Sequence, residues 1–232
     1  MYTRQEMCDQ LDDPGLVLDA DGTCPLSELT ASIDEICRQI EGQDDPAVVL
    51  VRLQPSPTNT RSWPGNVSIR EVNRWERAVR RLERTGAVSI ALAATSCAGP
   101  ALDLLLASDY RIATADTRLL LPVNDGQFWP GMGVHRLVNQ VGLARARQLV
   151  LWGGEILAEQ AVAIGLIDEI TSDPAAATQA AVVMLGRVAG AEHAIRRQLL
   201  LEAATTSYED ALGAHLAACD RELRRLRRIG EG

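Results

Sequence analysis

The chain of 232 residues contains no lysine, and all 23 of its basic residues are arginine. This absence excludes Schiff-base chemistry on a lysine and the P-loop lysine that contacts nucleotide phosphates. Because the formal net charge is −8, we expect no nucleic-acid partner. The one basic segment, residues 221–228, is interrupted by Leu223 and Leu226, which indicates the end of an amphipathic helix rather than a phosphate-binding tail.

Long apolar runs are also missing from the sequence. No stretch approaches the ~18 apolar residues that a membrane span requires, and the acidic N-terminal segment does not resemble a signal peptide. The five cysteines are scattered, without CxxC or Cys/His ligand spacing. This pattern favours free thiols in a reducing compartment. We therefore expect a cytoplasmic protein with no metal site and no membrane association.

The patterns that are present alternate between strands and helices. Apolar runs at 15–21, 47–53 and 87–94 are typical of strands. Amphipathic helices are predicted between them, over 27–41 and 68–86. Because the strands alternate with helices and read as continuous apolar runs, the sequence predicts an α/β fold with parallel crossover units.

The second half of the chain becomes increasingly helical. The sequence predicts strands at 110–114 and 118–122, then a Gly/Pro/aromatic loop and two helices separated near Gly142. Every segment after Pro174 is predicted to be helical. The sequence therefore predicts that the chain is divided into one core over 1–172 and a helical region over 173–232.

The common catalytic motifs are absent, because GxSxG, GxGxxG and GxxxxGK[ST] do not occur. Among the carboxylates, Asp103 lies one turn after Gly99-Pro100, at a predicted helix start. It either complements the helix dipole, a contribution of about 0.3–1 kcal/mol, or serves a site at that helix N-terminus. Asp109 ends the same helix and is expected to be a structural turn residue.

Three segments together resemble the crotonase (enoyl-CoA hydratase/isomerase) superfamily. They are LLLASDYRIATADTRLLLP, the PGMG block followed by RL and VG, and LWGGEILAEQAVAIGLIDEI, in the order and spacing of that family. The resemblance implies an α/β crotonase (ClpP-like) spiral of ββα units. It also implies an acyl-CoA thioester as ligand and a helical C-terminal region used in trimer contacts, here residues 173–232.

The same resemblance implies how the ligand is held. Family members polarise the thioester carbonyl with two backbone N–H groups, one from a glycine at a helix start and one from an earlier loop. The hydratases add two glutamates. Transferred to this chain, the glycine falls on Pro100, next to Gly99, the first glutamate on Asp103 and the second on Val123. For the loop donor, the nearest match is Gly65 and Asn66.

These departures predict that standard hydratase chemistry is compromised, because proline has no N–H and valine cannot transfer a proton. The pattern resembles the DpgB-type helper branch of the superfamily. That branch assists a type III polyketide synthase that makes 3,5-dihydroxyphenylacetyl-CoA from malonyl-CoA, on the route to dihydroxyphenylglycine in antibiotics. Two alternatives stay open: an active enzyme on a CoA thioester that uses Asp103, and a structural protein without activity.

Overall fold

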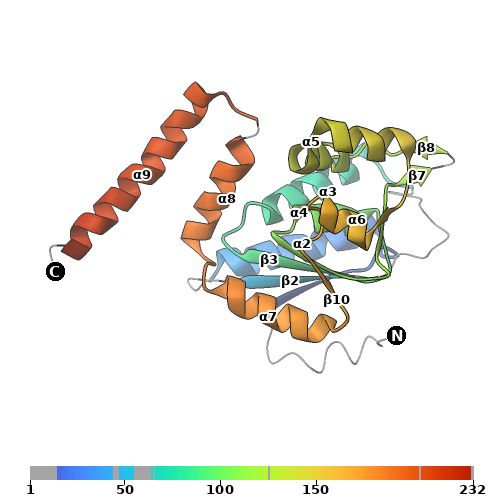
Figure 1. The fold of residues 1–232 in the computed structure, drawn as a ribbon, viewed down its shortest axis with the longest axis horizontal. Helices are drawn as coiled ribbons and strands as arrows, with labels where there is room; N and C mark the ends of the chain where they lie inside the picture. The colour runs from blue at the N-terminus through green and yellow to red at the C-terminus, as the bar shows by residue number, and fades with distance from the viewer. Residues whose placement is uncertain are drawn as a thin grey trace.

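The computed structural model describes residues 15–43, 47–54, 64, 66–124, 126–203 and 205–230. Five of the described strands form a parallel sheet in the order β1-β2-β3-β5-β10 (Figure 1). The strands are β1 (Leu16–Ala20), β2 (Val48–Leu53), β3 (Val88–Ala93), β5 (Tyr110–Thr114) and β10 (Glu169–Thr171). The predicted α/β crossover architecture is therefore confirmed.

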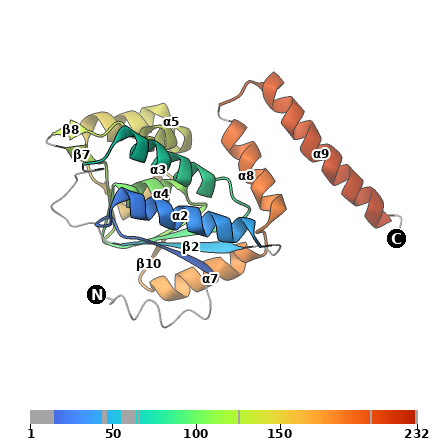
Figure 2. The same cartoon turned by 180° about the vertical axis from the view of Figure 1, so that it is seen from behind.

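Helices cover both faces of this sheet (Figures 1 and 2). On one face lie α2 (Leu26–Glu41), α3 (Ile69–Leu82) and α4 (Pro100–Ala107), which enclose the larger hydrophobic core. On the other face, α7 (Pro174–Gly186) packs Ala177 and Ala181 against strand residues such as Leu50 and Ile90. Burial on both sides explains why every residue of β3 is buried.

Several short strands complete the described fold, and of these the sequence predicted only β6. β4 (Ser96–Ala98), β6 (Arg118–Leu120) and β9 (Ile156–Leu157) form a second sheet, and β7 (Val123–Asn124) and β8 (Gln127–Phe128) form a hairpin. Strands of two or three residues are too short to show an alternating pattern. The predicted strand at 118–122 is accordingly shorter in the structure.

The structure places the end of α3 earlier than the sequence predicted and confirms an interruption in α5. Helix α3 begins with a capping box between Ser68 and Glu71 and ends at Leu82, whereas the sequence predicted a helix as far as Gly86. Helix α5 (Gly133–Trp152) is interrupted at Gly142, whose φ of +77° and ψ of +159° are not helical. The predicted separation into two helices near Gly142 is confirmed, because glycine adopts this backbone conformation without a steric penalty.

The chain continues through α6 (Ala158–Ala163) and ends in two helices, α8 (Ala191–Ala203) and α9 (Tyr208–Gly230). Both views show α9 beside α8 and away from the sheet (Figures 1 and 2). We call residues 191–230 the C-terminal arm. The division of the chain at residue 172 and the role of the C-terminal region in trimer contacts stay predictions.

One buried side chain attaches the arm to the rest of the molecule. Arg197 of α8 donates hydrogen bonds to the carbonyl oxygens of Glu83 (3.2 Å), Thr85 (2.9 Å) and Ala87 (2.6 Å). It also forms an ion pair with Asp109. The carboxylate of Asp109 accepts hydrogen bonds from the backbone N–H (2.8 Å) and hydroxyl (2.9 Å) of Ser89. Asp109 is therefore the structural residue that the sequence predicted.

The described helices include none that combines the length and the apolar character of a membrane span. The cytoplasmic location stays a prediction.

Candidate functional site

The candidate site begins where β4 meets α4. Gly99 has a φ of +56° and a ψ of −124°, a conformation that favours glycine because it has no Cβ. Pro100 occupies the first turn of α4 and is buried. Its fixed φ suits a helix start, and its ring removes the N–H that this position would otherwise present. Gly99 and Pro100 thus lie together, as predicted, at a helix N-terminus that has one donor fewer.

Asp103 lies one turn further along α4, and its carboxylate reaches across to α3. The side chain is buried, and Oδ2 accepts a hydrogen bond of 3.1 Å from Nε1 of Trp75. Oδ1 lies against the start of α5, where a Cβ added to Gly133 would be 3.4 Å from it. Because every residue of α4 is buried, Asp103 is held in the interior between three helices.

A single buried guanidinium faces this carboxylate. Nη1 of Arg136, on α5, lies 3.7 Å from Oδ1 of Asp103 and 3.2 Å from Oε2 of Glu76. Nε of the same arginine donates a hydrogen bond of 2.8 Å to Oε1 of Glu83. Glu76 also accepts a 3.3 Å hydrogen bond from the backbone N–H of Met132. We call Trp75, Glu76, Glu83, Asp103 and Arg136 the buried charge cluster.

The protonation of Asp103 reflects these surroundings. Burial raises the pKa of its carboxyl to about 7, against the attraction of Arg136 and with added repulsion from Glu76 and Glu83. The hydrogen bond from Trp75 favours the charged form and limits this shift. Arg136 itself is buried, but the neighbouring carboxylates outweigh the desolvation and raise its pKa. Asp103 can therefore gain or lose a proton near neutral pH, which suits an acid–base group.

The other predicted site residues belong to other segments of the chain. Val123 belongs to the β7–β8 hairpin, where it pairs with Phe128. Asn66 lies exposed just before the N-terminal cap of α3, while Gly65 lies outside the described residues. The structure thus brings Gly99, Pro100 and Asp103 together through the start of one helix. It shows no carboxylate at position 123.

Sequence reasoning missed Glu76, Glu83 and Arg136, and it treated Trp75 only as part of an apolar helix face. A partial signal was present, because an apolar residue followed by a glutamate occurs twice, seven residues apart, at Trp75-Glu76 and at Leu82-Glu83. This spacing places both glutamates along one stripe of α3, beside its apolar face. The spacing does not connect these two glutamates to Asp103 or Arg136, because only the fold brings those residues together.

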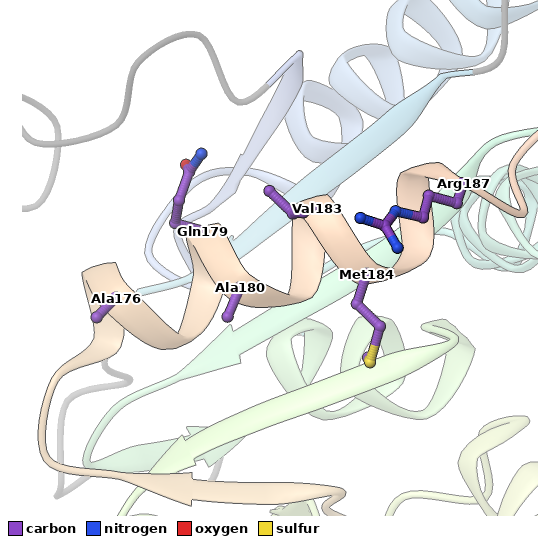
Figure 3. A pocket seen from close by; sticks show the side chains of 6 residues that line it. All are labelled: Ala176, Gln179, Ala180, Val183, Met184 and Arg187. Atoms are coloured by element: carbon purple, nitrogen blue, oxygen red, sulfur yellow. The ribbon is translucent and has the colours of Figure 1, made fainter.

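An open depression lies elsewhere, on the outer side of α7 (Figure 3). Its lining residues come from that helix alone: Ala176, Gln179, Ala180, Val183, Met184 and Arg187. Because α7 covers the sheet face opposite to α4 (Figure 1), this depression is separate from the buried charge cluster.

Comparison with known proteins identifies the chain's relatives. The family described as Enoyl-CoA hydratase/isomerase matches residues 72–226. This match covers more than half of the chain and includes the whole of the buried charge cluster. The chain belongs to the enoyl-CoA hydratase/isomerase family. A protein from Amycolatopsis orientalis named "Enoyl-CoA-hydratase" is 46% identical over 213 residues, which cover 90% of this chain and 96% of that protein.

Solved structures of the enoyl-CoA hydratase/isomerase family share the fold. An enoyl-CoA hydratase/isomerase from Cupriavidus metallidurans CH34 aligns with a TM-score of 0.69, 18% identity and coverage of 85% of this chain and 78% of the other. One from Marinobacter aquaeolei gives a TM-score of 0.68 at 18% identity, covering 92% and 86%. The predicted crotonase fold is therefore confirmed, and the functional interpretation depends on the site itself.

Proposed function

We propose that this family member is a helper protein that assists a type III polyketide synthase in making 3,5-dihydroxyphenylacetyl-CoA from malonyl-CoA, without itself hydrating an enoyl-CoA. The observation that carries the proposal is Pro100. It is buried at the first position of α4, and the family resemblance implies that this position supplies the N–H that faces the thioester oxygen. Loss of one such donor in an acyl-transfer enzyme costs about 10²–10³ in rate.

Two further features support the loss of hydratase chemistry. Val123 offers no proton at the position of the second glutamate. The carboxylate of Asp103, the remaining acid, already accepts a hydrogen bond from the indole N–H of Trp75. Its Oδ1 lies 3.7 Å from Nη1 of Arg136. Addition of water to a double bond requires one group to activate the water and a proton delivered to carbon. A single enclosed carboxylate is poorly suited to both tasks.

The ligand that we propose is an acyl-CoA thioester, bound without catalytic turnover or handed to the synthase. The chain still forms a helix N-terminus at Gly99, the start of α4, even though Pro100 removes a donor. We propose that the chain acts as a homo-oligomer, in contact with the synthase or with related crotonase-fold proteins. No additional cofactor is needed for this role.

A second candidate function is an enzyme of the hydratase/isomerase type that uses Asp103. The observation that favours it is the pKa of about 7 on a buried carboxyl, a value matched to acid–base work at neutral pH. The 46% identical relative is also named a hydratase. An isomerase, which moves one proton between two carbons, would need only a single carboxylate.

One paired assay separates these candidates. The purified chain is first mixed with crotonyl-CoA and longer enoyl-CoAs, and loss of the enoyl absorbance is followed. It is then added to a malonyl-CoA-consuming type III synthase, and the aromatic product and the pyrone by-products are measured. For the helper we expect no turnover alone, a higher aromatic yield with the synthase, and retention of that effect in Asp103→Asn.

Turnover of an enoyl-CoA by the chain without the synthase, abolished by Asp103→Asn, would establish the enzyme and overturn the helper role. An unchanged product ratio with the synthase would also overturn the helper role. Pro100→Gly provides a further control, because it restores an N–H while Val123 still lacks an acid. We expect this variant to remain inactive as a hydratase.

A further inference from the structure

The C-terminal arm buries few of its side chains. Among the described side chains of α8, only Arg197 is buried, and α9 buries none. The arm follows Gly190, whose φ of +106° favours glycine and whose N–H donates a 3.1 Å hydrogen bond to the carbonyl oxygen of Gly86. A segment with so few buried side chains opens at a low free energy. The polar contacts of Arg197 are therefore a large part of what holds the arm in place.

The guanidinium of Arg197 has more acceptors around one nitrogen than it has N–H groups to donate. Nη1 donates to the carbonyl oxygens of residues 83 and 85, as described above. Nη2 lies 2.6 Å from the carbonyl oxygen of Ala87 and 2.8 Å from Nε2 of His193, and it also pairs with Oδ2 of Asp109. The two N–H groups of Nη2 therefore serve three acceptors.

His193 lies one turn before Arg197 on α8, and its side chain is 17% exposed. A guanidinium nitrogen only donates hydrogen bonds. Because Nε2 of His193 lies 2.8 Å from Nη2 of Arg197, Nε2 is the acceptor, and the ring in this geometry is neutral with its proton on Nδ1. In that state the imidazole supports the position of Arg197.

The carboxylate of Asp109 has no free place for a charged imidazole. Its Oδ2 already accepts from the backbone N–H and the hydroxyl of Ser89 and from Arg197. Nε2 of His193 lies 3.4 Å from the same oxygen. A proton on Nε2 would add a fourth donor to an oxygen with about two lone pairs. It would also place a second cation beside Arg197, so that the two cations compete for Asp109.

The remaining charged groups near the junction do not relieve this competition. Arg111, on β5, adds a positive charge that interacts with Asp109. On α8 itself, Glu192 pairs with Arg196, and it also lies 3.8 Å from Arg221 of α9. These contacts leave Asp109 as the carboxylate that the imidazole faces.

Asp109 keeps its negative charge near neutral pH. Burial raises the pKa of its carboxyl, but the contacts with His193, Arg197 and Ser89 outweigh burial and hold the pKa below its ordinary value. Histidine is the side chain that ordinarily changes charge between about pH 5 and pH 8. In that range the imidazole is therefore the group of this junction that can change charge.

We propose that Asp109, His193 and Arg197 form a pH-sensitive latch, which holds the C-terminal arm on the rest of the chain while His193 is neutral and loosens it when the imidazole gains a proton. Gly190, at the start of the arm, is the joint about which the loosened arm turns. The protonation of one imidazole thereby sets how firmly the arm is held. This inference goes beyond the proposed function and does not depend on it.

The first test is amide hydrogen exchange in the full-length protein, corrected for the intrinsic pH dependence of exchange, at about pH 5.5 and about pH 7.5. We expect peptides from 191–230 to lose protection at least about fivefold at the lower pH, while peptides from β2 and β3 change little. His193→Gln retains an acceptor for Arg197 but cannot gain a proton, so it should show no such loss. His215→Gln, the same substitution at an exposed position of α9, is the matched control and should behave as wild type.

A wild-type arm whose protection does not depend on pH would overturn the proposal. A pH-dependent loss that persists in His193→Gln, or one that disappears equally in His215→Gln, would also overturn it. Asp103 titrates in the same range but is present in all three proteins. A loss of protection shared equally by β2 and β3 would indicate global destabilisation and would contradict a local latch.

The second test addresses the ring of His193 directly, by long-range proton–nitrogen correlation spectra of the full-length protein labelled with isotopic histidine. The signals are assigned with His135→Gln, His193→Gln and His215→Gln. At about pH 8 we expect Nε2 of His193 to carry no proton and Nδ1 to carry one. A proton on Nε2 at that pH would mean that the imidazole donates to Asp109 in the closed arm, and it would overturn the latch.

Discussion

Around Asp103, the chain encloses Arg136 with the buried Glu83 and Asp103 and the partly buried Glu76, between α3, α4 and α5. Along α9, which stands away from the sheet, it exposes four leucines, Leu212, Leu216, Leu223 and Leu226, which we call the α9 stripe. Both regions depart from the usual distribution of polar and apolar residues, in opposite directions. In the first, each charge has a partner inside the chain. In the second, the apolar surface is without a covering element among the described residues.

The two regions differ in whether contacts within the chain can stabilise them. A buried ion cluster is tolerable only when its members remain together, because any carboxylate left alone loses its hydration without compensation. An exposed apolar stripe has no such internal solution, and covering it requires another surface. Substitutions in the buried charge cluster should therefore destabilise the fold, whereas those in the α9 stripe should leave the stability of the chain nearly unchanged.

The largest expected effect is that of Arg136→Met, which keeps the volume of the side chain but removes the cation from three carboxylates. We expect the free energy of unfolding to fall by about 3–5 kcal/mol, as measured by urea denaturation. Arg118→Met is the control, because its ion pair with Glu155 is at the surface and should contribute at most about 1 kcal/mol. Equal losses in both variants would contradict the distinction between buried and exposed pairs.

Arg197→Met tests the junction between the two regions. The substitution leaves three carbonyl oxygens and Asp109 without their buried donor. We expect a loss of about 3 kcal/mol in the free energy of unfolding, together with faster amide exchange in α8 and α9. Arg196→Met, one residue earlier, breaks only an exposed pair with Glu192 and serves as the control. Exchange that accelerates throughout the sheet as well would argue against a local junction.

Asp103→Asn should have a smaller effect that depends on pH. Because the pKa of Asp103 is raised to about 7, the folded protein holds a proton that the unfolded chain releases near pH 4. Wild-type stability therefore decreases as pH rises from about 4 to about 7. The variant cannot titrate. Relative to wild type, its free energy of unfolding should increase by about 2–3 kcal/mol between pH 5 and pH 8.

Urea titrations at both pH values measure this difference. A difference between the variant and wild type that does not change with pH would mean that Asp103 is ionised throughout the range. Leu143→Gln, which replaces a 72% exposed side chain and alters no titratable group, provides the control, and its stability relative to wild type should be nearly constant over the same range.

The smallest expected effect on stability belongs to Leu216→Gln, which replaces an exposed leucine with a residue of similar helix propensity. The free energy of unfolding should change by no more than about 0.5 kcal/mol. Leu137→Gln, on α5, removes a leucine that is 1% exposed and should be far more destabilising. A large loss in Leu216→Gln would show that α9 packs its stripe within its own chain.

Much of the architecture could be predicted from local sequence. The continuous apolar runs of β2 and β3 and the regular apolar spacing of α2 indicate their structures, because neighbouring residues determine the period. The strands β4, β7 and β9 could not be predicted in this way. They are two or three residues long and depend on distant partners for their hydrogen bonds.

In the candidate site too, residues close in sequence could be predicted to lie together, whereas distant partners could not. Gly99, Pro100 and Asp103 are close in sequence, so their proximity at the start of α4 could be anticipated. The partners of Asp103 could not, since Trp75 is 28 residues away and Arg136 lies on α5. Family resemblance located Val123 at the missing second acid, but it gave no indication of the glutamates on α3.

The sequence by itself determined which chemical groups are present. There is no lysine in the chain, no N–H on Pro100 and no acid at position 123, and no folding arrangement can supply them. It also determined the spacing of the α9 stripe. Only the tertiary structure decided that Asp103 is enclosed with Arg136, because its protonation depends on burial and neighbouring charges. Likewise, only the fold decided that the α9 stripe faces outward, since helical periodicity creates an apolar side without specifying what will cover it.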